Sequence, residues 1–228
     1  MFPTQGLESF ENDDAKVINA ARLRHLETMG FPITGKTVLD VGCGVGHLAA
    51  FLHDKGGRVV CIDARDQNIQ TLRSKYPKLE ARPLDVETES LLELGKFQIV
   101  FCYGLLYHLE NPIVALRHMS EVCEETLLLE TIVTDHRQAL SRIVEESTSS
   151  NEALRGVGNR PTPSYVAFGL RSSGFKYVYT PNTPPDHPDF RFEWKNNLEH
   201  RRGGHNLRCI FIASKNELHN PRLTSMPS

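Results

Sequence analysis

The feature that most constrains the fold is the stretch at residues 30–46, which reads GFPITGKTVLDVGCGVG. It contains two glycine-rich signatures that nearly overlap. Residues 30–37 fit G-x-x-x-x-G-K-[ST], the pattern of a phosphate-binding loop. The glycines Gly42, Gly44 and Gly46 form a second glycine-rich turn. Two ligand-binding turns do not fit into so short a stretch, so the flanking elements decide between them.

The first signature lies in the wrong context. A phosphate-binding loop follows a strand and opens a helix, so that backbone N–H groups and the helix dipole face the anion. Residues 13–29 instead show helical spacing of apolar residues, and Asp13 and Asp14 suit an N-cap. Gly30 then suits a helix C-cap, and Thr37 enters a β-branched run. We interpret the Gly-Lys-Thr match as an accidental feature of a linker.

The second signature lies in the right context. The sequence predicts a strand over residues 37–41, a helix over residues 47–55 and a buried strand that ends at Asp63. Glycines at a strand-to-helix turn let a ligand approach the backbone, and an acidic residue at the next strand end is placed to bond ribose hydroxyls. The spacing is G-x-G-x-G, and Asp40 lies inside the preceding strand. This carboxylate disfavours a pyrophosphate and favours a nucleoside attached to an amino acid, whose ammonium group it would accept.

The rest of the chain predicts an α/β fold. Strands and helices alternate from residue 37 to residue 133, which indicates a doubly wound, mostly parallel sheet. We expect an N-terminal helical segment over residues 1–36, one domain over residues 37–215 and a flexible tail over residues 216–228. Residues 136–147 are predicted to be a helix. Residues 182–206 connect the last two strands and are long enough to form a lid.

Composition limits the class of protein. With 228 residues, 39% hydrophobic residues and a net charge of −2, the chain is an ordinary globular one without a general attraction to nucleic acids or anionic membranes. No apolar run approaches the roughly 20 residues of a membrane span. The five cysteines lack zinc-ligand spacing and suggest reduced thiols in a cytoplasmic protein. A metal site is not expected, because one group of possible ligands lacks closed spacing: Asp186, His187, Asp189, His200 and His205.

Five stretches resemble the motifs of one enzyme family. VLDVGCGVGHLAAFL and VVCIDA resemble the first two motifs of class I S-adenosylmethionine (SAM)-dependent methyltransferases. ARPLDVE resembles the third motif, FQIVFCYGLLYHLENP the fourth, and LLLET the fifth strand. The resemblance covers about residues 37–131. It implies a Rossmann-like sheet of seven strands with an antiparallel last strand, and S-adenosyl-L-methionine as the cofactor.

The resemblance also implies the cofactor-binding residues. The three glycines of the turn would wrap the methionine and ribose parts, and Asp63 would hold the ribose hydroxyls. Asp85 and Val86 would contact the adenine edge, and Tyr103 and Gly104 would lie under the methionine part. Asp85 could instead cap a turn, and Asp40 could serve only to hold the glycine loop. The full implied set is Asp40, Gly42, Cys43, Gly44, Gly46, Asp63, Ala64, Asp85, Val86, Tyr103 and Gly104.

The loop after the fourth strand is the expected place for catalysis. A hydroxyl acceptor needs a base, because its proton leaves as the new bond forms. His108 is the first candidate, since histidine commonly serves as a general base near neutral pH; alternatively it bonds a backbone carbonyl and shapes the loop. Tyr107 would orient the acceptor. Glu130 is either a second candidate base or a solvated loop residue. The amino-methyltransferase signature [DN]-P-P-[YFW] is missing here, which favours an oxygen acceptor.

Three functions fit these residues. The first is methylation of a small-molecule acceptor in a biosynthetic pathway. The second is tRNA wobble-uridine carboxymethylation, because YGLLYHLENP and PSYVAFGLRSSGFKYV are similar to that group, although Leu109 and Glu110 stand where that group has basic residues. The third is a SAM-binding regulatory protein without catalysis. The slightly negative net charge favours methylation of a small molecule and leaves tRNA as the alternative partner. No segment indicates an oligomeric state.

Overall fold

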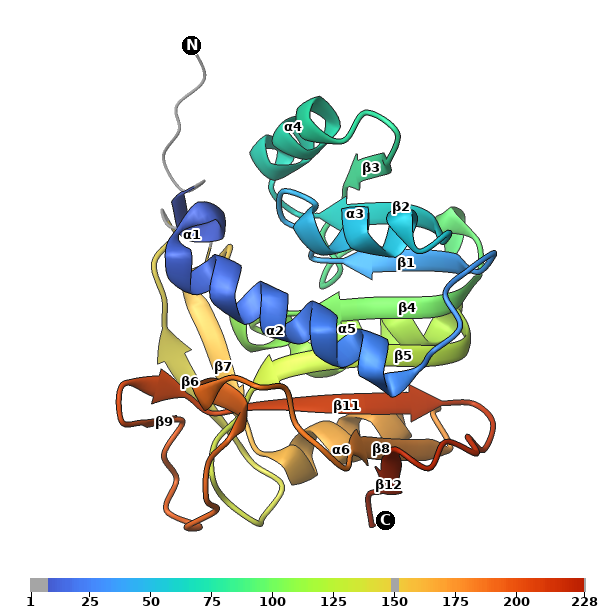
Figure 1. Ribbon diagram of the computed structural model, residues 1–228. Helices are drawn as coiled ribbons and strands as arrows, with labels where there is room; N and C mark the ends of the chain where they lie inside the picture. The colour runs from blue at the N-terminus through green and yellow to red at the C-terminus, as the bar shows by residue number, and fades with distance from the viewer. Residues whose placement is uncertain (1–7, 149–151, 228) are drawn as a thin grey trace.

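A central sheet of eight strands organises the molecule (Figure 1). The computed structural model describes residues 8–148 and 152–227, so the first seven residues of the expected N-terminal segment lie outside it. The strand order is β12-β8-β11-β5-β4-β1-β2-β3. The bounds of these strands are β1 Thr37–Val41, β2 Arg58–Asp63, β3 Glu80–Pro83, β4 Phe97–Tyr103, β5 Cys123–Ile132, β8 Tyr177–Pro181, β11 Arg208–Ser214 and β12 Leu223–Ser225.

The topology confirms the expected fold class. Strands β3, β2, β1, β4 and β5 are parallel, and the chain order reverses between β1 and β4. In such sheets ligands bind outside the carboxyl ends of the strands near that reversal. Strand β11 runs antiparallel to both β5 and β8. Strand β12 adds an eighth member antiparallel to β8.

This eighth strand comes from the segment that was expected to be a flexible tail. Leu223 packs against the core, and the backbone N–H of Met226 donates to Val178 O at 2.8 Å. Pairing with an existing edge strand therefore orders residues that carry little secondary-structure signal of their own.

Helices cover both faces of the sheet. The buried strand residues alternate between two core clusters: Leu39 and Val100 belong to one, and Val38 and Phe101 belong to the other. Helices α5 (Pro112–Val122) and α6 (Pro163–Ser172) pack on the first cluster. Helices α2 (Asp13–Met29), α3 (His47–Asp54) and α4 (Asp66–Lys75) pack on the second. This alternation is why the strands read as continuous apolar runs.

The elements around the accidental Gly-Lys-Thr match form as expected, except for the N-cap of the first long helix. Helix α2 ends at Met29, and Gly30 adopts the left-handed C-cap conformation with φ 70°. The N-cap is Asn12, whose side chain accepts from Ala15 N, and not the aspartates that follow it. Those aspartates occupy the first turn, where they favour the helix dipole. A short helix, α1 (Glu8–Glu11), precedes α2.

The predicted helix over residues 136–147 is wrong. Residues Ser141–Glu145 form β6, which pairs antiparallel with β7 (Val157–Pro161) in a separate two-stranded sheet. Ile143 is 76% exposed, so the apolar residues of this segment do not form a buried helical stripe. The β6–β7 pair stands at the end of the main sheet toward which β1, β4 and β5 point (Figure 1).

The segment that was expected to form a lid contains short regular elements. Residues 182–206 contain the 3₁₀ turn η3 (Pro188–Phe190) and the short strands β9 (Arg201–Arg202) and β10 (His205–Asn206). Two further 3₁₀ turns, η1 (Leu92–Leu94) and η2 (Leu106–His108), flank β4. Among the described residues, no helix has the length and apolar character needed to span a membrane.

Candidate active site

A cavity of about 750 Å³ lies at the carboxyl ends of the parallel strands. Its wall brings together ten of the fourteen predicted site residues: Gly42, Cys43, Asp63, Ala64, Asp85, Val86, Tyr103, Gly104, Tyr107 and His108. The remaining four, Asp40, Gly44, Gly46 and Glu130, are absent from this wall. The motif residues are therefore neighbours in space as well as in sequence.

The glycine turn has a shape that only glycine permits. Gly42 has φ 74°, and a Cβ there would lie 2.8 Å from the Leu105 side chain. Gly44 has φ 53°, and a Cβ there would lie 2.6 Å from the Phe10 ring. Phe10, from α1, also lines the cavity, so the N-terminal segment covers the turn.

Asp63 closes the turn from the second strand. Its carboxylate accepts hydrogen bonds from Gly44 N at 3.0 Å, from Arg65 N at 2.9 Å and from Asn68 Nδ2 at 3.0 Å. Burial raises the pKa of Asp63, and these donors oppose that rise. An ionised carboxylate accepts about four hydrogen bonds, so one position remains for a ligand hydroxyl.

Asp40 is buried under the turn with an unsatisfied oxygen. Its Oδ2 has no hydrogen-bond partner among residues 8–148 and 152–227. Burial, followed by the neighbouring charge of Asp63, raises the pKa of Asp40 to about 8. A buried carboxylate in this state gains most from a nearby cation. The group fits the ammonium end of the amino-acid part of SAM.

The expected adenine end contains an ion pair that the sequence did not reveal. Asp85 accepts from Glu87 N and from Thr88 Oγ1, so it does cap a turn, and it also pairs with Arg155. Burial would raise the pKa of Asp85, but the Glu87 N–H and Arg155 lower it overall. Arg155 also pairs with Glu87 at 3.1 Å. Arg155, just before β7, is thereby held by two carboxylates at this end of the cavity.

The opposite end of the cofactor region is rich in hydrogen-bond donors. Gly104 has φ 84°, and a Cβ there would lie 3.5 Å from an Arg22 guanidinium nitrogen. Arg22 Nε and Tyr103 Oη are buried, and neither has a partner within the described part of the chain. Both residues line the cavity. Arg22 lies on α2 and carried no signal in the sequence, yet it offers the charge that a methionine carboxylate requires.

Glu130 occupies a different position from the one expected. It is fully buried in β5 rather than solvated, and it accepts from Arg22 at 2.5 Å and from Arg208 at 3.0 Å. Burial would raise its pKa, but the two arginines lower it. A carboxylate held ionised by two cations behind the cavity wall is a poor proton acceptor, so this position disfavours Glu130 as a base.

His108 forms a dyad with a residue that the sequence did not indicate. Its Nδ1 bonds the carboxylate of Glu146, just after β6, and the ring lines the cavity. Glu146 also accepts from Arg160 Nη2 at 2.6 Å and from Ala153 N at 3.1 Å. Burial would raise the pKa of Glu146, but His108 and Arg160 lower it. The dyad replaces the backbone-carbonyl contact that was the alternative role for His108.

Tyr107 lies between two arginines. The Arg160 and Arg208 guanidinium carbons lie 5.5 and 5.1 Å from the centroid of its ring, within the range of cation–π contacts. Its hydroxyl oxygen faces Arg208 Nη2 at 3.4 Å. The ring and hydroxyl are therefore held in place at the cavity wall.

The candidate lid, residues 182–206, joins this wall through one aspartate. Asp189, in η3, accepts from Arg208 Nε at 3.0 Å and contacts His205 Nδ1 at 3.2 Å. His187 Nδ1 lies 3.7 Å from the same carboxylate. No group of three or more potential ligands in the described ranges is arranged to hold a metal ion.

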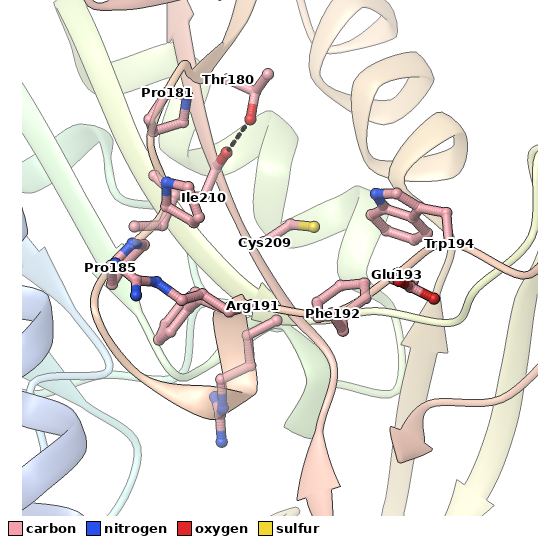
Figure 2. A pocket seen from close by; sticks show the side chains of 12 residues that line it. Thr180, Pro181, Pro185, Arg191, Phe192, Glu193, Trp194, Cys209 and Ile210 are labelled. Atoms are coloured by element: carbon pink, nitrogen blue, oxygen red, sulfur yellow. Dashed lines mark hydrogen bonds between the residues drawn. The ribbon is translucent and has the colours of Figure 1, made fainter. Parts of the chain in front are cut away.

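A second cavity of about 700 Å³ lies between the lid and strands β8 and β11 (Figure 2). Phe192 and Trp194 form an edge-to-face pair with centroids 4.8 Å apart, and the Cys209 sulfur points toward them (Figure 2). Burial, with the charge of Glu130, raises the pKa of Cys209 to about 12, so this thiol is unreactive. Arg208 lines both cavities and separates them.

Comparison with known proteins identifies the family. Residues 38–126 match the family described as methyltransferase domain. A ubiquinone biosynthesis O-methyltransferase of Bordetella parapertussis is 30% identical over 168 residues, covering 70% of each chain. A tRNA U34 carboxymethyltransferase of Pseudoalteromonas translucida is 31% identical over 162 residues, covering 68% of this chain and 48% of that protein.

The chain thus spans about half the length of several curated relatives it matches. A structure of the N-terminal domain of EvdMO1, determined in the presence of S-adenosylhomocysteine (SAH) and D-fucose, has the same fold. It gives a TM-score of 0.65 at 20% identity and covers 86% of this chain and 82% of that one. The chain belongs to the family of SAM-dependent methyltransferases.

Proposed function

We propose that this chain transfers a methyl group from SAM to a hydroxyl oxygen of a small molecule in a biosynthetic pathway. The cavity wall, together with Asp40 buried directly under the glycine turn, offers complementary groups for the whole cofactor. Asp40 would take the ammonium group, Arg22 the carboxylate, Asp63 the ribose hydroxyls, and the region of Asp85 and Val86 the adenine. Bound there, SAM supplies a methyl group activated by its sulfonium. The protein then has to align the acceptor and exclude water.

The observation that carries an oxygen acceptor is the His108–Glu146 dyad. Because Nδ1 faces the Glu146 carboxylate, Nδ1 carries the proton and Nε2 remains free to accept one. The acceptor hydroxyl would give its proton to Nε2, and Glu146 would stabilise the resulting imidazolium. The ring lines the cavity, as catalysis requires. The related Bordetella protein is named an O-methyltransferase, which agrees with this chemistry.

The tRNA alternative requires a free basic surface. It would be built from Arg191, Lys195, Arg201, Arg202 and Arg208, and three of these five are occupied by carboxylates. Arg191 pairs with Asp186, Arg202 pairs with Asp135, and Arg208 is buried against Glu130. Together with the net charge of −2, this pairing supports a small acceptor. Binding to a tRNA anticodon stem-loop that weakens steeply with salt would favour the alternative.

Two measurements test the proposal. Isothermal titration calorimetry should detect binding of SAM and SAH, and Asp63→Ala should weaken both at least about tenfold, because a charged hydrogen-bond acceptor is lost. A SAH-release assay against a library of phenols and sugars should then detect turnover. His108→Ala should lower kcat by about 10²- to 10⁴-fold while leaving SAH affinity unchanged. Cofactor binding without any convertible acceptor would instead indicate the non-catalytic regulatory protein.

A further inference from the structure

On the acceptor side of the cavity, arginines retain N–H donors that no acid of the described residues uses. The acids that line this side are Glu146, Asp189 and Glu152, and the first two are ion-paired. Arg160 shares Glu146 with His108, and its buried Nε has no partner among the residues described.

Two further arginines next to this region form no ion pair in the described residues. Arg201, on β9, lines the cavity, and within the described part of the chain its side chain donates only to Gly204 O, at 3.2 Å. Arg142, on β6, donates to Leu198 O at 2.8 Å. His200 also lines the cavity, and its pKa is lowered by burial and then by the charges of Arg160, Arg142 and Arg201. Arg142 lies opposite Arg160 in the β6–β7 pair, so these two arginines are neighbours beside the cavity wall.

This arrangement lies close to the proposed reaction centre. Arg160 and His108 bond the two oxygens of the same carboxylate, Glu146. Arg160 also stacks on the Tyr107 ring and donates to Tyr107 O at 3.1 Å. A group bound at Arg160 would therefore be one side chain away from the base. A guanidinium group without a carboxylate partner, which is the state of Arg201 among the described residues, is a strong site for carboxylates and phosphates.

We propose that the acceptor carries a carboxylate or phosphate group, and that Arg160 and Arg201, beside His200, bind it. This inference rests on the proposed function, because it assigns the acceptor class of the same cavity. The anion balances the charge of Arg201, accepts from the unpartnered Nε–H of Arg160 and fixes the distance between the acceptor hydroxyl and His108. Arg142, opposite Arg160 in the β6–β7 pair, adds positive charge near the same group.

The test measures anion preference in the SAH-saturated protein at 150 mM salt, an ionic strength of the physiological order. The probes are 4-hydroxybenzoate, 4-hydroxyphenyl phosphate and the neutral 4-hydroxybenzamide, each titrated by calorimetry. We expect at least one anionic probe to bind about tenfold or more tighter than the amide. The anionic probe that binds more tightly, the benzoate or the phosphate, shows whether the acceptor carries a carboxylate or a phosphate.

Variants then locate the preference. Arg201→Gln should remove most of it, and Arg142→Gln combined with Arg201→Gln should abolish it. Arg58→Gln is the matched control, because it removes the same charge from an exposed residue at the amino end of β2 and should preserve the preference. Equal affinity for acid and amide, no binding of either anion, or an unchanged preference in the double variant would overturn the inference.

Two outcomes separate this inference from its premises. If SAH itself fails to bind, the proposed function fails. If SAH binds normally but the anion preference is absent, only the acceptor class is wrong. Displacement of the anionic probe by an anticodon stem-loop RNA would assign the arginines to a phosphate of the RNA backbone, and would overturn the small-molecule acceptor.

Discussion

At the scale of single residues, Asp40 makes a prediction about pH. Its pKa is raised from 3.8 to about 8, so the folded state holds this proton more tightly than the unfolded chain does. The contribution to stability is therefore complete below pH 4 and is lost as pH rises toward 8. Chemical denaturation from pH 5 to pH 9 should show wild-type stability falling relative to Asp40→Asn, by about 2–5 kcal/mol across that range. The exposed Asp54→Asn serves as the control.

Parallel curves for wild type and Asp40→Asn would contradict this prediction. Saturating SAH should reduce the difference between the two curves at high pH, since the ammonium group of SAH would stabilise ionised Asp40. The ligand effect ties the buried charge to the cofactor rather than to the packing of the sheet.

Glu146 makes a second prediction at this scale. Glu146→Gln keeps the size of the side chain but removes the charge that stabilises protonated His108, so kcat should fall by about 10²-fold with SAH affinity unchanged. The neighbouring Glu145→Gln is the control, because Glu145 is exposed and forms no ion pair in the described residues. A fall in kcat for both variants alike would argue against the dyad.

At the scale of elements, the sequence predicted the parts of the site that backbone geometry dictates. The glycine turn and Asp63 follow directly from a strand–turn–helix–strand order, so residues 37–63 are readable from local pattern. The dyad is different: His108 and Glu146 are 38 residues apart, and their contact depends on the pairing of β6 with β7. Propensity suggested a helix there, and strand pairing overrode it.

The arginines show the same limit. Arg22 donates to Glu130, which is 108 residues away in the sequence. The spacing of residues within α2 cannot predict this contact. Arg22 is on the buried side of α2, where an apolar residue would be expected from helical spacing alone. Its charge becomes intelligible only beside β5 and the cavity, because a buried arginine needs a partner carboxylate.

The β6–β7 pair yields a prediction about an element rather than a side chain. A Cβ at Gly158 would lie 2.6 Å from the Glu146 carboxyl carbon and 2.9 Å from the backbone oxygen of Tyr107. Gly158→Ala should therefore displace Glu146 from His108. We expect kcat to fall at least about tenfold and the free energy of unfolding by about 1–3 kcal/mol, with SAH affinity retained. Full activity in Gly158→Ala would show that Glu146 can move without cost to catalysis.

At the scale of the whole molecule, a chain of buried charges links three parts of the fold. Arg22 on α2, Glu130 on β5, Arg208 on β11 and Asp189 in the lid alternate in sign and contact one another in that order. One end is the proposed carboxylate site of the cofactor, and the other end holds the candidate lid. Removing one member of this chain leaves a buried charge unpaired. Cofactor binding at Arg22 should therefore change the ion pair of Asp189 and the position of the candidate lid.

The single tryptophan of the chain provides the measurement. Trp194 lies in the lid and is 54% exposed, so its fluorescence reports on lid position. Adding SAH should change the tryptophan emission of the wild type. The Trp194→Phe variant has no tryptophan and should show no such change. Asp189→Asn should still bind SAH but lose most of the emission change, because the lid is no longer tied to Arg208.

The matched control for this prediction is Asp186→Asn, which removes an exposed carboxylate of the candidate lid and should keep the full change. Among residues 8–148 and 152–227, Asp186 pairs only with Arg191. Denaturation curves must confirm that Asp189→Asn is folded, since breaking a buried ion pair costs about 3–5 kcal/mol. An emission change that survives in Asp189→Asn would mean that the lid responds to the cofactor by direct contact, and the charge chain would then serve only to hold β5, β11 and α2 together.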